Sequence, residues 1–157
     1  MYIAESELFK DVGTHTLEAI SGQGEERTFN SGDVVFKEDD RAERFYVLGE
    51  GSVDLTMGRE QLCFVVNRPG EVFGWSALVE PYKYRASAHC TTQCRLLEIP
   101  RDVIEKVGQD HPKDGITIFR NLAGIVTGKL RDSYRQRISD AEMAEEQAAP
   151  RAKVYGG

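Results

Sequence analysis

The sequence predicts a mainly β domain, a small sandwich, jelly roll or barrel, with helices before and after it. Seven short β-like runs follow one another at close intervals, each bounded by Gly, Asn, Asp or Pro. They cover residues 27–29, 34–37, 44–48, 52–57, 61–67, 84–91 and 95–99. On either side of this region, apolar residues recur at helical spacing. We expect one folded domain over residues 1–138 and a helical extension with a frayed tail over 139–157.

The segment before the β region is expected to form two short helical pieces within residues 5–21. Gly13 separates them, and Gly22 and Gly24 end the second. Within the β region, expected at residues 25–99, Asn30 to Asp33 forms a turn. Gly49 to Gly51 and Gly58 to Glu60 have the composition of hairpin tips.

After Pro100 the apolar spacing becomes helical. Residues 101–109 predict a short helix with one apolar face, and Pro112 suits the first turn of a longer helix over 112–138. We expect the tail to stay helical to about Ala149. The apolar positions of the long helix are Ile116, Phe119, Leu122, Ala123, Val126, Leu130, Tyr134 and Ile138. This stripe either lies across the β region or pairs with a second copy of the chain.

Composition limits the classes of function. The net charge is −6 with no basic cluster, so the chain is a poor candidate for following a nucleic-acid backbone. No segment is apolar enough to span a membrane, and the first residues lack the pattern of a signal peptide. Three cysteines without framework spacing indicate reduced thiols and a cytoplasmic location.

The most informative stretch is residues 69–88, which we interpret as an anion-binding cradle. Gly74 lets the backbone approach a ligand closely, and residues 75–78 can form one helical turn with free N–H groups. Arg85, expected within a strand, can grip two phosphate oxygens with its planar guanidinium. The alternative is that Arg85 pairs with an intramolecular carboxylate such as Glu71 or Glu80.

This stretch resembles the phosphate-binding cassette of cyclic-nucleotide-binding domains, which occur in cAMP-receptor-type bacterial regulators, kinase regulatory subunits and gated channels. The order of Ser-Gly-Asp-Val-Val-Phe, Phe-Tyr-Val-Leu, Gly-Ser-Val and Pro-Gly-Glu segments is also similar to the family's β-roll signature. The resemblance implies a β-roll, or double-stranded β-helix, followed by a long C-terminal helix. It also implies these ligand-binding residues: Phe73, Gly74, Trp75, Ser76, Ala77, Arg85, Ala86 and Ser87.

Two residues depart from the family pattern. Trp75 stands where the family has a Glu that accepts a hydrogen bond from the ribose 2′-hydroxyl, and Asp39 replaces a turn glycine. Asp tolerates the left-handed conformation, so we expect that turn to persist. In the family, hydroxyl side chains of the long helix often contact the base of the nucleotide. Lys129 and Leu130 stand near that place here, so the resemblance implies altered recognition of the base. The resemblance therefore implies a sensor for a cyclic nucleotide or another phosphorylated small molecule, with altered or weakened specificity for cAMP and cGMP.

The resemblance also favours the dimeric reading of the long helix, because bacterial relatives dimerise through it. We predict a homodimer centred on Leu122, Val126, Leu130 and Tyr134. The helix–turn–helix domain of the family's transcription regulators is not seen after the long helix, so we expect no direct binding to nucleic acid. The alternative function is a ligand-free interaction or dimerisation module in which Trp75 fills the pocket.

Other chemistries fit the sequence less well. Gly74 to Leu78 lacks the second glycine of a nucleophile elbow, and no Walker loop, dinucleotide fingerprint or catalytic carboxylate pair is present. His89, Cys90 and Cys94 are close in sequence but lack the paired spacing of a zinc site. We therefore expect neither catalysis nor a metal.

Overall fold

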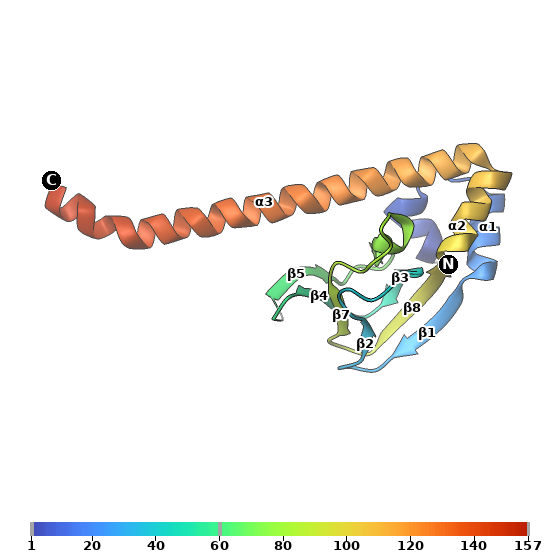
Figure 1. The fold of residues 1–157 in the computed structure, drawn as a ribbon, viewed down its shortest axis with the longest axis horizontal. Helices are drawn as coiled ribbons and strands as arrows, with labels where there is room; N and C mark the ends of the chain where they lie inside the picture. The colour runs from blue at the N-terminus through green and yellow to red at the C-terminus, as the bar shows by residue number, and fades with distance from the viewer. Residues whose placement is uncertain (1, 60, 157) are drawn as a thin grey trace. The chain divides into compact units, whose positions relative to one another are not determined.

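The computed structural model describes residues 2–59 and 61–156 (Figure 1). Two 3₁₀ turns, η1 (Tyr2–Glu5) and η2 (Glu7–Phe9), precede helix α1 (Thr14–Gln23). The strands follow, and then come helices α2 (Arg101–Asp110) and α3 (Pro112–Gly156). The chain divides into two compact units, Met1–Leu122 and Ala123–Gly157, which meet within α3.

Eight strands form two antiparallel four-stranded sheets. The first has the order β1 (Glu25–Phe29), β8 (Cys94–Pro100), β3 (Arg44–Glu50) and β6 (Val72–Phe73). The second has the order β2 (Val34–Phe36), β7 (Ser87–Cys90), β4 (Val53–Met57) and β5 (Gln61–Val66). Neighbours in a sheet are mostly distant in sequence, which is the jelly-roll arrangement. The predicted fold class is therefore confirmed.

Within the first sheet, β3 is buried on both faces, whereas β1 is mostly exposed. On β3, Phe45, Val47 and Leu48 are fully buried and Tyr46 is 5% exposed. Successive side chains of a strand point to opposite faces of the sheet, so β3 is buried on both faces. In Figure 1, α1 and α2 lie side by side next to β1 and β8. The β-roll core therefore continues beneath these helices.

An aromatic cluster fills the space between the sheets. Phe36 of β2 stacks on Tyr84 with ring centroids 3.8 Å apart and planes 9° apart. Tyr46 and Phe73, which are register partners on β3 and β6, stack at 5.4 Å. The Phe36 ring lies 6.0 Å from Tyr46 and 6.1 Å from Phe73, so it links the two pairs.

Two strand assignments from the sequence were wrong. The short β6 was missed, because two residues are too few to show an alternating pattern. Residues 84–86 were expected to extend β7, which begins only at Ser87. The N–H of Tyr84 instead donates to the Asp40 carbonyl, and the Tyr84 carbonyl accepts from the Asp39 N–H. Tyr84 thus makes its backbone hydrogen bonds with the β2–β3 turn, which is distant in sequence, and not as part of an extended β7.

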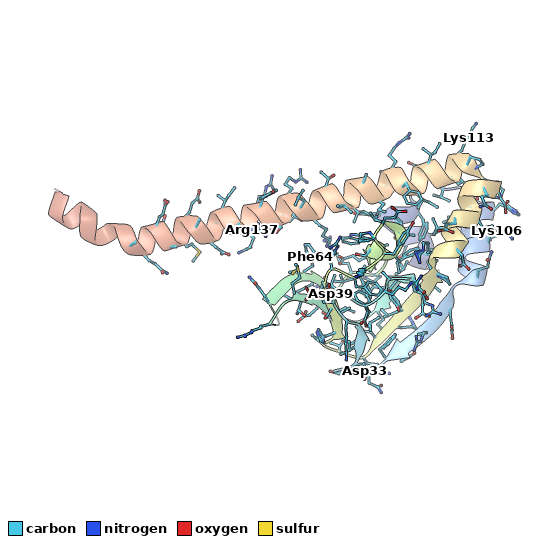
Figure 2. The ribbon with its side chains drawn as sticks, in the orientation of Figure 1. Asp33, Asp39, Phe64, Lys106, Lys113 and Arg137 are labelled. Atoms are coloured by element: carbon cyan, nitrogen blue, oxygen red, sulfur yellow. The ribbon has the colours of Figure 1, made fainter. Side chains whose placement is uncertain are left out.

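Asp39 has the left-handed conformation expected at the turn where the family has glycine, with φ of 72°. It lies between β2 and β3 and is labelled in Figure 2. Its N–H bonds to Tyr84 at 2.9 Å. The turn therefore persists without glycine and also anchors the segment that leads to β7.

The helices follow the predicted order, but α3 buries a different face from the one expected. On α2, Val103, Ile104 and Val107 are buried as expected. On α3, Ile118 is 0% exposed and Leu122 is 4% exposed, whereas Ile116 and Phe119 are 59% and 45% exposed. The apolar run Ile-Thr-Ile-Phe is compatible with either rotation of the helix, so the sequence did not reveal which residues face the core.

Candidate anion-binding site

Gly74 heads the short turn on which the candidate site depends. It follows β6 and caps the 3₁₀ helix η3 (Trp75–Leu78), with φ of 75° and ψ of 22°. This conformation favours glycine. A Cβ atom here would lie 3.1 Å from Cε2 of Phe36, closer than an ordinary contact. The expected helical turn is therefore present, and both its backbone angle and its close neighbour favour glycine at its head.

The N–H groups available at this turn differ from those expected. The Ala77 N–H donates to the Gly74 carbonyl at 3.1 Å, so it is not free. Within the part of the chain that the structure describes, the N–H groups of Trp75 and Ser76 have no acceptor. Gly74, Trp75 and Ser76 are all half-buried, so a ligand can reach them. The turn offers two adjacent donors to an anion.

Arg85 is exposed and lies in a bend rather than within a strand. Among residues 2–59 and 61–156, no carboxylate forms an ion pair with it. Glu71, one of its two suggested partners, accepts instead from the N–H groups of Asn67 and Arg68. It also pairs with the Arg68 guanidinium at 3.6 Å. Arg85 is therefore an exposed residue without a carboxylate partner in that part of the chain.

The backbone on both sides of Arg85 is held in place. Tyr84 bonds to the β2–β3 turn through its N–H and carbonyl, and its hydroxyl donates to the Arg44 carbonyl at 2.5 Å. On the other side, the hydroxyl of Ser87 accepts from the Glu38 N–H at 2.8 Å. That hydroxyl still has its own proton to donate. The bend is thus anchored at both ends, which reduces the entropy that a ligand would have to remove.

The eight residues assigned to the site fall into two groups. Phe73 and Ala77 are 0% exposed, so their side chains pack beneath the turn and do not reach a ligand. The half-buried or exposed residues are Gly74, Trp75, Ser76, Arg85, Ala86 and Ser87. The first two lie beneath the candidate site, and the others are accessible at its surface.

Sequence reasoning missed a buried ionic group near the aromatic cluster. Glu98 is 5% exposed on β8 and pairs with Arg27 at 2.9 Å and Arg44 at 3.4 Å. Its register partner is Tyr46, whose pKa is raised mainly by burial and further by the Glu98 charge. The sequence does contain a signal for this buried group, because Glu98 is the only polar residue in the run Leu-Leu-Glu-Ile. Two arginines satisfy this carboxylate, so it is not available to compete for Arg85.

The cysteines are unpaired, and two of them are buried. Cys90 and Cys94 are 2% and 1% exposed, and burial raises the pKa of the Cys90 thiol to about 12. Among the described residues, no group of three His, Cys, Asp or Glu side chains is arranged to hold a metal ion. None of the described helices combines the length and apolar character needed to cross a bilayer.

Comparison with known proteins identifies the family. The model of the family described as the cyclic nucleotide-binding domain matches residues 26–111, more than half of the chain. The chain therefore belongs to the cyclic nucleotide-binding domain family. The matched range contains all eight residues assigned to the site.

Individual relatives agree with this assignment. A CRP-like cAMP-activated global transcriptional regulator of Mycobacterium tuberculosis is 26% identical over 125 residues, which are 77% of this chain and 55% of the regulator. Glutaminase 2 of Bradyrhizobium diazoefficiens is 26% identical over 130 residues, 83% of this chain and 20% of the enzyme. The chain thus spans about half of the first relative and a fifth of the second.

A solved structure from Geobacter metallireducens GS-15, described as that of a cyclic nucleotide-binding protein, superimposes with a TM-score of 0.73 at 29% identity. The match covers 82% of this chain and 95% of that one. The two-sheet arrangement is therefore shared over nearly the whole of the other protein.

Proposed function

We propose that this chain is a non-catalytic, cytosolic regulatory domain that binds a small phosphate-containing ligand, a cyclic mononucleotide or a related molecule. The phosphate would lie between the Arg85 guanidinium and the N–H groups of Trp75 and Ser76. The observation that carries the proposal is Arg85 itself, an exposed cation that has no ion-pair partner among the described residues and lies on a bend anchored at both ends.

The physical case rests on charge and preorganisation. An arginine can hold two phosphate oxygens at once, and losing such a charge-assisted contact costs about 2–5 kcal/mol. The adjacent N–H groups supply further donors without any rearrangement of the turn. The chain carries a net charge of −6, so attraction of an anion has to come from a local site and not from the protein as a whole.

Trp75 is proposed to change the ligand preference. It occupies the family position of the glutamate that accepts from the ribose 2′-hydroxyl, and an indole has no acceptor to replace it. Leaving that hydroxyl without a partner costs roughly 1–3 kcal/mol. We expect the wild type to bind cAMP and cGMP weakly and Trp75→Glu to bind them more tightly.

Isothermal titration calorimetry with cAMP and cGMP tests the proposal. The variants are Trp75→Glu, Arg85→Gln and the double variant, with Arg41→Gln as a matched control. Arg41 is a nearby exposed arginine whose side chain is 82% accessible and whose backbone bridges Lys83. Arg85→Gln should abolish binding in both backgrounds, whereas Arg41→Gln should change affinity less than twofold.

Two results would each contradict one part of the proposal, the role of Trp75 or the binding of a ligand. Micromolar binding of cAMP by the wild type would mean that Trp75 does not weaken sugar recognition. Absence of binding by both the wild type and Trp75→Glu, with cAMP, cGMP and cyclic dinucleotides, would favour the ligand-free interaction module instead.

We further propose that the protein forms a homodimer through α3. The apolar residues Val126, Leu130 and Tyr134 are 38%, 54% and 56% exposed in the single chain. They recur every four residues, so they lie near one another on the helix surface. Leu122, which the sequence assigned to the same contact, is 4% exposed and already packs within the first unit. The proposed contact therefore begins after it.

A further inference from the structure

Tyr84 directly precedes Arg85 and is the best anchored residue of the bend. It is 5% exposed, and both backbone polar groups bond to the β2–β3 turn, with the Tyr84 N–H 3.0 Å from the Asp40 carbonyl oxygen. Its hydroxyl donates to the Arg44 carbonyl. Burial raises the pKa of this hydroxyl to about 12, so it remains a donor throughout the physiological pH range.

The Tyr84 ring is connected to the other half of the site through one side chain. It stacks on Phe36 at 3.8 Å, and the same Phe36 ring is the nearest neighbour of the position where a Cβ on Gly74 would lie, at 3.1 Å. Phe36 thus contacts both the residue before Arg85 and the residue at the head of η3. Because protein cores are close-packed, a change in one contact shifts the other.

We infer that Tyr84 is a positioning residue that acts through Phe36 to set the distance between the Arg85 guanidinium and the N–H groups of Trp75 and Ser76. The inference deepens the proposed function and rests on it. Arg85 has a long and mobile side chain, so its reach is defined only if its backbone is fixed relative to the turn. The stack of Tyr84 on Phe36 provides that reference.

The single tryptophan makes the geometry measurable without an identified ligand. Trp75 is half-buried, and its backbone N–H belongs to the proposed site. Iodide is an anionic quencher of its fluorescence, and acrylamide is a neutral one. A unit charge about 6 Å away in water, at about 0.1 M salt, raises the local iodide concentration about twofold. The ratio of the two quenching constants therefore reports whether a cation lies beside Trp75.

The experiment compares this ratio in wild type, Arg85→Gln, Tyr84→Leu, Tyr84→Phe and Phe36→Leu. Arg85→Gln should lower the ratio about twofold, and the effect should disappear near 1 M salt because screening then acts within about 3 Å. Tyr84→Leu and Phe36→Leu should lower it nearly as much. Tyr84→Phe, which keeps the ring stack, should give an intermediate ratio that a merely structural role would not produce.

Phe45→Leu is the matched control. Phe45 is fully buried on β3, but it alternates with Tyr46 and so lies on the opposite face of the sheet. It should leave the ratio unchanged although it removes similar core volume. Far-ultraviolet circular dichroism establishes whether each variant is folded. If Tyr84→Leu does not fold, the ratios of Phe36→Leu and Tyr84→Phe test the positioning role.

The two possible failures are distinguishable. If Arg85→Gln leaves the ratio unchanged, the Arg85 guanidinium does not lie beside Trp75, and both the proposed anion site and the positioning role are overturned. If Arg85→Gln lowers the ratio but folded Tyr84 and Phe36 variants match the wild type, the anion site stands and the positioning role alone is overturned.

Discussion

Replacing Gly74 by alanine should weaken both the fold and the proposed site. The left-handed conformation, with φ of 75°, costs a residue with a Cβ about 1 kcal/mol more than glycine. The new Cβ would also lie 3.1 Å from Phe36 and 3.4 Å from Tyr46. Because Phe36 already stacks on Tyr84, it cannot move aside freely. Overpacking of this kind adds about 1 kcal/mol.

Gly58→Ala provides the matched control. Gly58 has φ of 60°, and the structure places nothing within 4 Å of a Cβ at that position. It should show only the backbone cost of about 1 kcal/mol, whereas Gly74→Ala should show ~2 kcal/mol. For a chain of this size, these values correspond to decreases in Tm of roughly 2–4 °C and 4–8 °C.

Urea denaturation followed by circular dichroism measures the free energies of unfolding. Calorimetry with cAMP in the Trp75→Glu background measures the effect on the site, where we expect a decrease in affinity of about tenfold, or 1.4 kcal/mol. Equal losses of stability in the two alanine variants would refute the role of Phe36. Unchanged affinity in Gly74→Ala would show that the turn does not contribute donors to the ligand.

Three further predictions concern other parts of the chain. The pKa of Asp114 is lowered chiefly by the hydroxyl of Thr16 and also by the Gly13 N–H. Its contribution to stability is therefore present above the unfolded value near 3.9 and is lost as pH falls through the lower folded value. Asp114→Asn should destabilise the protein at pH 7, and its difference from the wild type should shrink as the pH falls below the unfolded value, as read from urea midpoints. Replacing both Val126 and Leu130 by Glu should convert a dimer to a folded monomer in light scattering, and a monomeric wild type at high micromolar concentration would disprove the contact. The chain alone should not retard duplex DNA sequence-selectively in a gel shift at moderate salt, because its net charge is −6; a selective shift would overturn this.

The sequence by itself determined those features that local chemistry controls. Hairpin turns and the left-handed turn at Asp39 could be placed because their conformations depend mainly on the residue and its immediate neighbours, whereas the left-handed conformation of Gly74 was not predicted. The 3.6-residue period identified α2 and the first part of α3, and the alternating period identified most strands. The ordered turns together with the cassette were sufficient to recognise the family.

Only the tertiary structure decided how the site is assembled. Residues 84–86 have the composition of a strand, but Tyr84 bonds to a turn that is distant in sequence, so Arg85 lies on an exposed bend. Packing decided which apolar residues of α3 face the core. Ile116 and Ile118 are chemically equivalent, but only Ile118 is buried. The partners of Glu98 and the stack of Tyr84 on Phe36 join strands from different parts of the chain. Such contacts depend on distances between elements, and a local pattern carries no information about those distances.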